Sequence, residues 1–257
     1  MYKSCLRCLW YRCRISVGHS APANAAGLSA VRSLVFDPIA KGSDMTISSC
    51  DIAQAFLQSD KFPESDPARF LKVRDPITKQ YRYFRQWGVL YGSKSSSVRW
   101  QRTLHPWLES IGFRQGFNEP CAFYHPERKI RLLSYVDDLL TKASRADAEW
   151  FYKQLFERSD CKEVQWLTAD KPLDHLGMTI FMDETGVFIS MQDYIRTMLV
   201  KLGMEGCADS RVRTPMRKPI TDFTEVDSDE KAFFMSVCGM IGWLASTARP
   251  DLKHALP

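Results

Sequence analysis

The chain has 257 residues, of which 45% are hydrophobic and 25% charged. This is the composition of an ordinary folded protein, and it excludes a wholly disordered chain. The length allows one large domain or two small ones. The formal net charge is +5, and five of the 35 basic residues precede the first acidic residue, Asp37. Without these five, the rest of the chain is balanced against its 30 acidic residues. Composition alone therefore does not indicate nucleic-acid binding.

No window approaches the roughly 18 uninterrupted apolar residues of a membrane helix. The N-terminal apolar run is interrupted by Arg7, Arg12 and Arg14, where a secretory signal would need continuous apolar residues. We therefore expect a soluble intracellular protein that is neither secreted nor bound to a membrane.

The eight cysteines are spread through the chain, which favours reduced thiols over a disulfide framework. Most are expected to be small core residues. One cluster has the spacing C-x2-C-x4-C-x5-H: Cys5, Cys8, Cys13 and His19. A zinc knuckle has its histidine third and a cysteine fourth, an order that this cluster does not have. Two interpretations stay open: zinc binding, and an N-terminal segment without a fold.

Taken in chain order, residues 1–30 are basic and then rich in small residues, which is typical of a linker. Residues 45–52, MTISSCDI, predict a strand that runs into Asp51, with a short helix after it. Two β-prone runs around Asp75-Pro76 predict a hairpin. Serines 95–97 can cap a helix whose apolar side chains recur at helical spacing up to Gly112: Leu104, Trp107, Leu108 and Ile111.

The segments CAFYH and IRLLSYV predict two strands, and the second leads directly into Asp137 and Asp138 before LLTKA resumes strand character. Two acids thus occupy the tip of a hairpin. A second amphipathic helix follows, with apolar positions at Ala148, Phe151, Tyr152, Leu155 and Phe156. The order strand, helix, strands, helix predicts an α+β fold, a split βαβ sheet with its helices on one face.

A further hairpin is predicted around Glu184–Gly186, followed by a helix that ends at Gly203. Residues 207–227 read as a connector. Asp227 and Glu230 predict a capping box for a last helix through Leu244. We expect four segments, with boundaries at 1–30, 31–160, 161–206 and 207–257.

An Asp-Asp pair between apolar strands is costly to desolvate unless a cation or hydrogen bonds compensate. Asp137 and Asp138 therefore suggest a metal site, although an exposed turn with hydrated acids explains the pair equally simply. Asp51 ends another apolar strand, which can lie beside this hairpin in an antiparallel sheet. Three oxygen donors could then hold magnesium together with substrate phosphates.

The sequence here resembles copia-type reverse transcriptases of LTR retrotransposons. SCDIAQAFL is similar to their D-x-x-x-A-F-L motif, LLSYVDDLL to their Y-V-D-D box, and VLYGSKSSSVRW to their L-Y-G-L-K-Q-x-P-R-x-W segment. The similarity continues in family order through HLGMTI, ISMQDYI, TPM and ARPDL, from about Leu28 to the C-terminus. It implies the palm of a right-hand polymerase and a small thumb-like or connection module, with the fingers largely missing.

The resemblance implies that Asp51, Asp137 and Asp138 are catalytic and bind two Mg²⁺ ions, with Mn²⁺ as a substitute and Ile52 part of the metal site. It implies that Phe56 is a steric gate against ribonucleotides, where the residue alone is as well explained as a core aromatic. It further implies three nucleotide-binding residues and four of a structural motif: Tyr91, Gly92 and Lys94, then Tyr135, Val136, Leu176 and Gly177.

The partners implied are an RNA or DNA template with a primer, deoxynucleoside triphosphates and the other segments of the Pol polyprotein. The compartment implied is the cytoplasm, in virus-like particles, or the nucleus. Trp100 and Trp107 are expected in the core rather than stacked on bases.

The sequence departs from the family pattern where Ser93, Ser95, Ser97 and Val98 replace typical Leu, Gln, Pro and Arg. The basic upstream fingers segment and the RNase H, protease and integrase domains have no counterpart, as expected of a fragment or a decayed copy. Two hypotheses therefore follow. One is an RNA-directed DNA polymerase domain, and the other is a catalytically silent remnant that at most binds nucleic acid or a protein partner.

Overall fold

The computed structural model describes residues 27–37, 44–93, 95–206 and 227–255. The cysteine and histidine cluster of residues 5–19, Lys94 and most of the expected connector lie outside these ranges. The described chain forms two compact units. The first contains the residues up to Leu34 and those from Asp44 to Gln165, and the second contains residues 35–37 and those from Trp166 onward.

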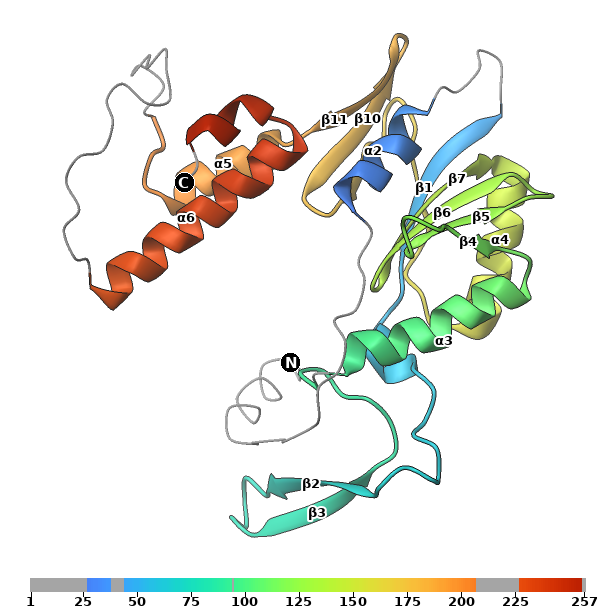
Figure 1. Ribbon diagram of the computed structural model, residues 1–257, viewed down its shortest axis with the longest axis vertical. Coiled ribbons are helices and arrows are strands. Elements are labelled where there is room, and N and C mark those ends of the chain that lie inside the picture. The colour runs from blue at the N-terminus through green and yellow to red at the C-terminus, as the bar shows by residue number, and fades with distance from the viewer. Residues whose placement is uncertain (1–26, 38–43, 94, 207–226, 256–257) are drawn as a thin grey trace. The chain divides into compact units, whose positions relative to one another are not determined.

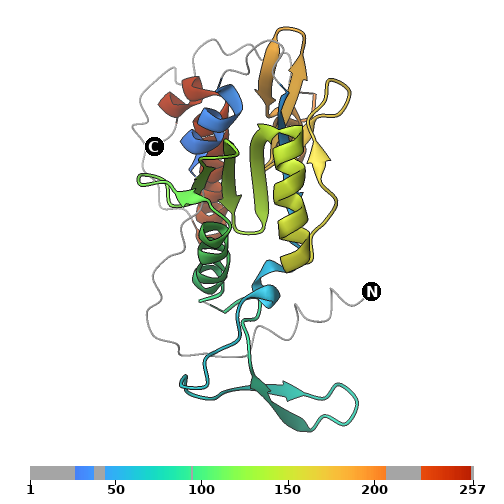
Figure 2. The same cartoon turned by 90° about the vertical axis from the view of Figure 1, so that its right-hand side faces the viewer.

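The first unit is built on a six-stranded sheet (Figures 1 and 2). Its strands, in spatial order, are β4 (Arg114–Gln115), β5 (Ala122–His125), β6 (Ile130–Tyr135), β7 (Asp138–Ser144), β1 (Met45–Asp51) and β8 (Gln165–Trp166). The pairs β4–β5, β5–β6, β6–β7 and β7–β1 are antiparallel. The strand that ends at Asp51 thus lies beside the strand that begins at Asp138.

Two helices cover this sheet, α3 (Ser96–Ser110) and α4 (Arg145–Arg158). Ring centroids of Trp107 in α3 and Phe151 in α4 are 6.5 Å apart, so the helices contact each other. A guanidinium nitrogen of Arg158 also donates to the carbonyl of Thr103 at 3.2 Å. The core between helices and sheet is apolar, which follows from the alternating strand pattern and the helical spacing of the sequence. Its fully buried members include Ile47, Trp100, Leu104, Leu108, Leu139, Leu140, Phe151 and Leu155.

Helix α2 (Leu28–Phe36) contributes Val31 and Leu34 to the buried side chains of the first unit. Lys142, in the middle of β7, is 1% exposed, and its ammonium group donates to the carbonyl of Leu34 at 3.0 Å. A buried ammonium group needs such an acceptor because an unpaired charge in an apolar interior is strongly destabilising.

A separate two-stranded hairpin, β2 (Arg69–Arg74) and β3 (Tyr81–Gln86), extends from the first unit. Its turn is stabilised by Asp75, whose side chain accepts hydrogen bonds from the amides of Ile77 and Thr78 at 2.8 and 3.0 Å. This is the hairpin that the Asp75-Pro76 dipeptide predicts.

The second unit contains a three-stranded sheet of β9 (Leu173–His175), β10 (Met178–Asp183) and β11 (Gly186–Ser190). Its helices are α5 (Gln192–Lys201), α6 (Ser228–Thr247) and the 3-10 helix η4 (Pro250–Ala255). The hydroxyl of Tyr194 in α5 donates to the carbonyl of Met240 in α6 at 3.2 Å. Within the described residues, no helix combines the length and apolarity needed to cross a membrane.

The elements predicted from the sequence are largely confirmed, and four details differ. The segment after Asp51 forms a 3-10 helix, η2 (Ala55–Gln58). Ser95 is the N-cap of α3 but makes no capping hydrogen bond with its side chain; instead Ser96 donates to the carbonyls of Leu90 and Ser93, both at 2.8 Å. Phe156 is 48% exposed rather than buried. Asp227 caps α6 as predicted, but the helix runs three residues beyond Leu244.

Candidate metal and nucleotide site

The carboxylates of Asp51 and Asp138 belong to directly paired residues at the end of the β1–β7 ladder. Tyr135 pairs with Asp138 on the other side, so β6 and β7 are joined by a two-residue turn, Val136-Asp137. The amide of Ile52 donates to the carbonyl of Asp137 at 2.8 Å. The expectation that Asp51 lies beside the hairpin tip of Asp137 and Asp138 is thereby confirmed.

The turn at the hairpin tip has an unusual backbone. Val136 has φ 59°, a left-handed conformation that is a true outlier for a β-branched residue. A positive φ at the first central position is the signature of the mirror-image turns that match the twist of hairpin strands. The indole nitrogen of Trp100 in α3 donates to the carbonyl of Val136 at 2.6 Å. This hydrogen bond from helix α3 thus stabilises the strained turn.

Asp137 in the turn and Asp138 at the start of β7 are both half-buried, unlike the hydrated acids of an exposed turn. Burial raises the pKa of Asp137, and the charge of Asp51 raises it further. Burial likewise raises the pKa of Asp138, together with the charges of Asp137 and Asp51. Three crowded carboxylates repel one another, so the cluster favours a cation.

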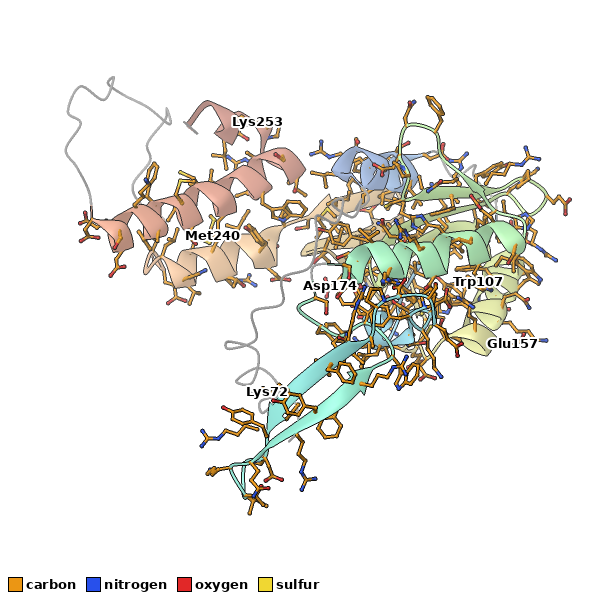
Figure 3. All side chains as sticks on the ribbon, turned by 60° about the horizontal axis from the view of Figure 1, so that its bottom comes forward. Lys72, Trp107, Glu157, Asp174, Met240 and Lys253 are labelled. Atoms are coloured by element: carbon orange, nitrogen blue, oxygen red, sulfur yellow. The ribbon has the colours of Figure 1, made fainter. Side chains whose placement is uncertain are left out.

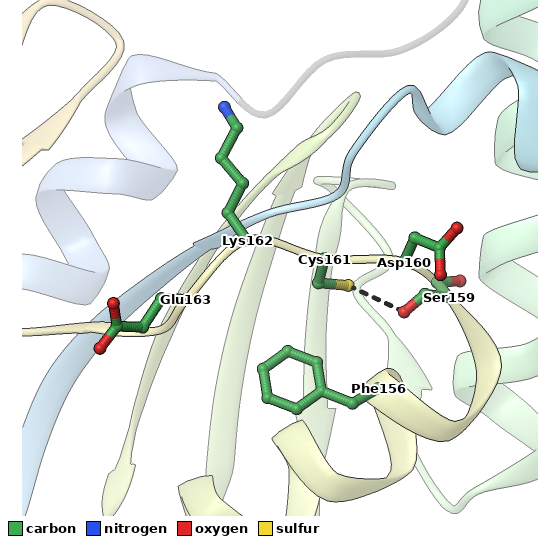
Figure 4. A pocket seen from close by; sticks show the side chains of 6 residues that line it. All are labelled: Phe156, Ser159, Asp160, Cys161, Lys162 and Glu163. Carbon is green, nitrogen blue, oxygen red and sulfur yellow. Dashed lines mark hydrogen bonds between the residues drawn. The ribbon is translucent and has the colours of Figure 1, made fainter.

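Lys162 is the cation nearest to Asp51. Its ammonium group donates to the Asp51 carboxylate at 2.8 Å, and this hydrogen bond raises the pKa of the lysine. Lys162 also lines an open depression of about 370 Å³ with Phe156 and Cys161, and Figure 4 shows its side chain pointing away from those two. Because the Lys162 side chain is 67% exposed, the ion pair is weak enough to exchange for another cation.

Among the described residues, no three acidic, histidine or cysteine side chains form a ready-made metal cluster. Magnesium, however, is commonly held by one or two carboxylates with the remaining oxygens supplied by substrate phosphates and water. The donors fit that pattern, since Asp51 and Asp138 are paired in register and Asp137 is adjacent to both. The arrangement supports a site that is completed by a phosphate-bearing ligand.

Phe56 and Tyr91, both expected to bind nucleotide, lie together: their ring centroids are 5.1 Å apart. Phe56 is half-buried in η2, and it is not among the core residues. Burial raises the pKa of Tyr91, and the charges of Asp137 and Asp51 raise it further. Gly92 has φ 89°, which a residue with a side chain would adopt only under strain.

The 3-10 helix that carries Phe56 is fixed to the segment before Lys162. The side-chain amide of Gln58 donates to the carbonyl of Asp160 at 3.0 Å, and the amide of Asp160 donates back to Gln58 Oε1 at 2.9 Å. The same Gln58 nitrogen donates to the carbonyl of Ala53. Phe56 is therefore positioned by bonds that join segments about a hundred residues apart.

The three remaining expected residues are Leu176, Gly177 and Lys94. Leu176 and Gly177 form the two-residue turn between β9 and β10 in the second unit, with φ 51° and 77°. Their role is structural, since a turn with two positive φ angles joins tight hairpins. Lys94 lies outside the described residues.

Sequence reasoning missed two residues that shape the site, Lys162 and Gln58, and missed the contact of Trp100 with the turn. Trp100 was expected in the core and is 1% exposed, but the sequence does not show that its indole reaches Val136. Lys162 and Gln58 are ordinary polar residues of types that are usually hydrated. Only the pairing of residues 160–162 with residues 51–53 brings Lys162 to the Asp51 carboxylate and Asp160 to Gln58.

Comparison with known proteins shows a similarity to a yeast transposon protein. The chain is 27% identical over 218 residues to a Saccharomyces cerevisiae protein named "Putative transposon Ty5-1 protein", and the match covers 79% of this chain and 66% of that protein. The chain thus spans just under two thirds of the relative's length. No family model matches the sequence. The similarity supports a transposon-related, retrotransposon-derived protein.

Proposed function

We propose that this chain is the reverse transcriptase domain of a copia-type retrotransposon, an RNA-directed DNA polymerase that adds deoxynucleotides to a primer. The observation that carries the proposal is the convergence of Asp51, Asp137 and Asp138 at one end of the β1–β7–β6 ladder. The sheet with α3 and α4 on it would be the palm, and the second unit would be the thumb-like module.

In this function Asp51, Asp137 and Asp138 would hold two magnesium ions, with the carbonyl of Ile52 as a further donor. When bound, magnesium supplies activation of the primer hydroxyl and neutralisation of the triphosphate. The carboxylates orient these charges, and burial of Asp137 and Asp138 strengthens the attraction because less water screens it. Lys162 would leave Asp51 when the cations bind.

The aromatic pair Phe56 and Tyr91 would form the wall against the sugar of the incoming nucleotide. A ring at that place leaves no room for a ribose 2′-hydroxyl, and Gly92 lets the backbone approach the ligand without a side chain between them. Val136 would place the acids at the tip, because the left-handed turn directs Asp137 out of the strand register.

The test is primer extension by the purified full chain on an RNA template with a DNA primer, Mg²⁺ and the four deoxynucleoside triphosphates. Extension should be abolished by Asp137→Asn and retained by Asp60→Asn, an exposed acid of the same unit. Extension that survives Asp137→Asn would place the chemistry elsewhere. Absence of extension by a folded chain that also shows no Mn²⁺ binding dependent on Asp51 and Asp137 would leave only the second candidate.

The second candidate is a catalytically silent retrotransposon remnant. The observation that favours it is the ion pair of Lys162 with Asp51. The residues Ser93, Ser95, Ser97 and Val98, which differ from the family pattern soon after Tyr91 in the sequence, also favour it. Mn²⁺ titration separates the two: the polymerase requires that Mn²⁺ displace Lys162, whereas the remnant shows no binding that depends on Asp51 and Asp137.

A further inference from the structure

The β2–β3 hairpin has one face made entirely of aromatic and cationic side chains. Directly opposite residues in a ladder share a face, and side chains alternate along each strand. The register therefore places three cross-strand pairs on one face, each of an aromatic with a cation: Phe70 with Arg85, Lys72 with Tyr83, and Arg74 with Tyr81. We call these six residues the aromatic–cationic face.

All six side chains of this face are exposed. Phe70, Tyr81 and Tyr83 have 63%, 56% and 66% of their surface open to solvent. A monomeric protein rarely exposes this many large apolar rings together unless they contact a partner. Figure 3 shows the side chains of the hairpin, with Lys72 labelled, projecting from its two strands.

The cations of the face already contact its rings. The ammonium group of Lys72 lies 4.1 Å from the ring centroid of Tyr81 and 5.9 Å from that of Tyr83. The guanidinium of Arg85 lies 3.9 Å from the ring of Trp87, which follows β3 and is 49% exposed. These contacts orient the rings without covering them, since more than half of each tyrosine remains open.

The charge of the segment has one sign. Residues 69–87 contain six basic residues and a single acid, Asp75. Asp75 is in the turn rather than in the face, and its carboxylate is engaged by two amides of the turn and by Arg82 at 3.4 Å. No acid on either strand opposes the positive potential of the aromatic–cationic face.

The opposite face of the hairpin differs in character. It carries Arg69, Leu71, Val73, Arg82, Phe84 and Gln86. Leu71 and Val73 are half-buried, and the guanidinium of Arg69 lies 4.1 Å from the ring of Phe62 and 3.7 Å from Asp66. Asp66 also pairs with Arg99 in α3 at 2.9 Å. Phe84 and Arg82 on this face are exposed, Phe84 by 50%. The half-buried side chains of the two strands nevertheless all lie on this face, whereas every side chain of the aromatic–cationic face is exposed.

We propose that the aromatic–cationic face binds single-stranded nucleic acid, with bases stacked on Phe70, Tyr81 and Tyr83 and phosphates held by Lys72, Arg74 and Arg85. Single strands offer both open base faces and a row of negative charges, which is what alternating rings and cations recognise. A duplex keeps its bases stacked inside and offers the rings nothing. Binding at this face would depend only on its rings and cations and would require no divalent ion.

The test is fluorescence anisotropy of the full chain with a labelled oligo-U or oligo-dT of about 12 nucleotides, a length within the site sizes of single-strand binders. The buffer contains EDTA, so that the carboxylate site plays no part. We expect binding that weakens with salt, and a duplex of equal length should bind at least about tenfold more weakly, as expected when base stacking is lost.

Matched variants locate the site. The double change Tyr81→Thr with Tyr83→Thr replaces each ring by another residue of high β-propensity and should weaken binding by about tenfold or more. Lys72→Gln with Arg85→Gln should weaken binding and reduce the salt slope by about 1.4, for two lost phosphate contacts on a single strand. Phe84→Thr and Arg82→Gln, on the opposite face, should leave binding unchanged.

Three results would overturn the inference. One is equal weakening by the variants of the two faces, and another is binding of the duplex as tight as that of the single strand. The third is equally tight binding of a poly-glutamate peptide, which would indicate an acidic protein partner. Amide exchange of residues 69–86 checks that the hairpin is formed, and Tyr81→Leu with Tyr83→Leu replaces the threonine variant if it is not. Because binding is measured without metal, failure of this inference and failure of the polymerase proposal are separate outcomes.

Discussion

The three carboxylates of Asp51, Asp137 and Asp138 favour the binding of a cation but lower the stability of the metal-free protein. Asp137 and Asp138 have raised pKa values because burial and neighbouring negative charge penalise their ionised forms. An acid whose pKa is higher in the folded than in the unfolded state destabilises the fold once the pH exceeds both values. The cluster is therefore a destabilising feature of the metal-free protein, as is common at functional sites.

Asp138→Asn should stabilise the metal-free protein at pH 7, by up to about 1 kcal/mol when allowance is made for solvent screening of a half-exposed group. The gain should shrink as the pH falls through the raised pKa of Asp138, because the wild-type acid then becomes neutral as well. Urea unfolding at several pH values measures this, with the exposed Asp60→Asn as control. A loss of stability at neutral pH, without metal, would show that Asp138 is held by hydrogen bonds rather than penalised by burial.

Phe56 gives the test of nucleotide selection. If primer extension is observed, Phe56→Ala should raise ribonucleotide incorporation relative to deoxynucleotide incorporation by at least about tenfold, because pocket discrimination by bulk is of this order. Leu57→Ala, in the same 3-10 helix and 47% exposed, is the matched control. Unchanged selection in the Phe56 variant would reduce the ring to a packing partner of Tyr91.

At the scale of elements, the β9–β10 hairpin contains a buried histidine that makes the stability of the fold depend on pH. His175 is 2% exposed, and neither of its ring nitrogens has a hydrogen-bond partner within the described part of the chain. Burial lowers the pKa of His175 from 6.5 to about 4. The imidazole is neutral in the folded state near neutral pH. As the pH falls, His175 takes up a proton in the unfolded chain before it does so in the folded protein.

This depressed pKa stabilises the fold fully above pH 6.5, and the contribution is lost as the pH falls from about 6.5 to about 4. The loss should reach about 3.5 kcal/mol, since each pKa unit between 6.5 and about 4 corresponds to about 1.4 kcal/mol. His175→Leu should remove this acid sensitivity, which amide exchange of β10 at pH 7 and pH 4.5 would report. An equal acid sensitivity in the variant would assign it to other groups.

The elements themselves were the most predictable part of the protein. Strand β1 ends at Asp51 as MTISSCDI predicts, and α3 and the hairpins follow from periodicity and turn residues. These signals are local, so one sequence contains them. The left-handed Val136 could not be foreseen, because a β-branched residue is the least favoured choice there and tolerates it only with the support of Trp100.

Contacts between distant segments were beyond prediction. The Asp51–Lys162 pair and the Gln58–Asp160 bonds join residues more than a hundred positions apart and depend on sheet order. The aromatic–cationic face was hidden for a related reason. Both strands contain aromatic and basic residues, and only the register sorts them into one fully exposed and one partly buried face, since a shift of one residue exchanges the faces.

At the scale of the whole molecule, the division into two units separates the proposed chemistry from the rest of the chain. Asp51, Asp137 and Asp138, the Phe56–Tyr91 pair and the β2–β3 hairpin all belong to the first unit. The second unit has its own buried positions, Leu173, Met178 and Ile180 among them. Units with separate cores unfold separately unless a large interface couples them.

We therefore expect that Leu173→Asp will unfold the second unit and spare the first. Leu173 is fully buried in β9, and an unpaired charge there costs several kcal/mol, more than a small sheet can bear. Amide exchange should show protection lost in β9 to β11 and kept in β1, β6 and β7. Mn²⁺ and single-stranded oligonucleotide binding should also persist, because their residues lie in the first unit. Leu140→Asp, at a fully buried position of β7, is the reciprocal variant and should abolish both kinds of binding. Loss of protection throughout the chain in the Leu173 variant would show that the two units fold as one, and the carboxylate site would then depend on the second unit for its stability.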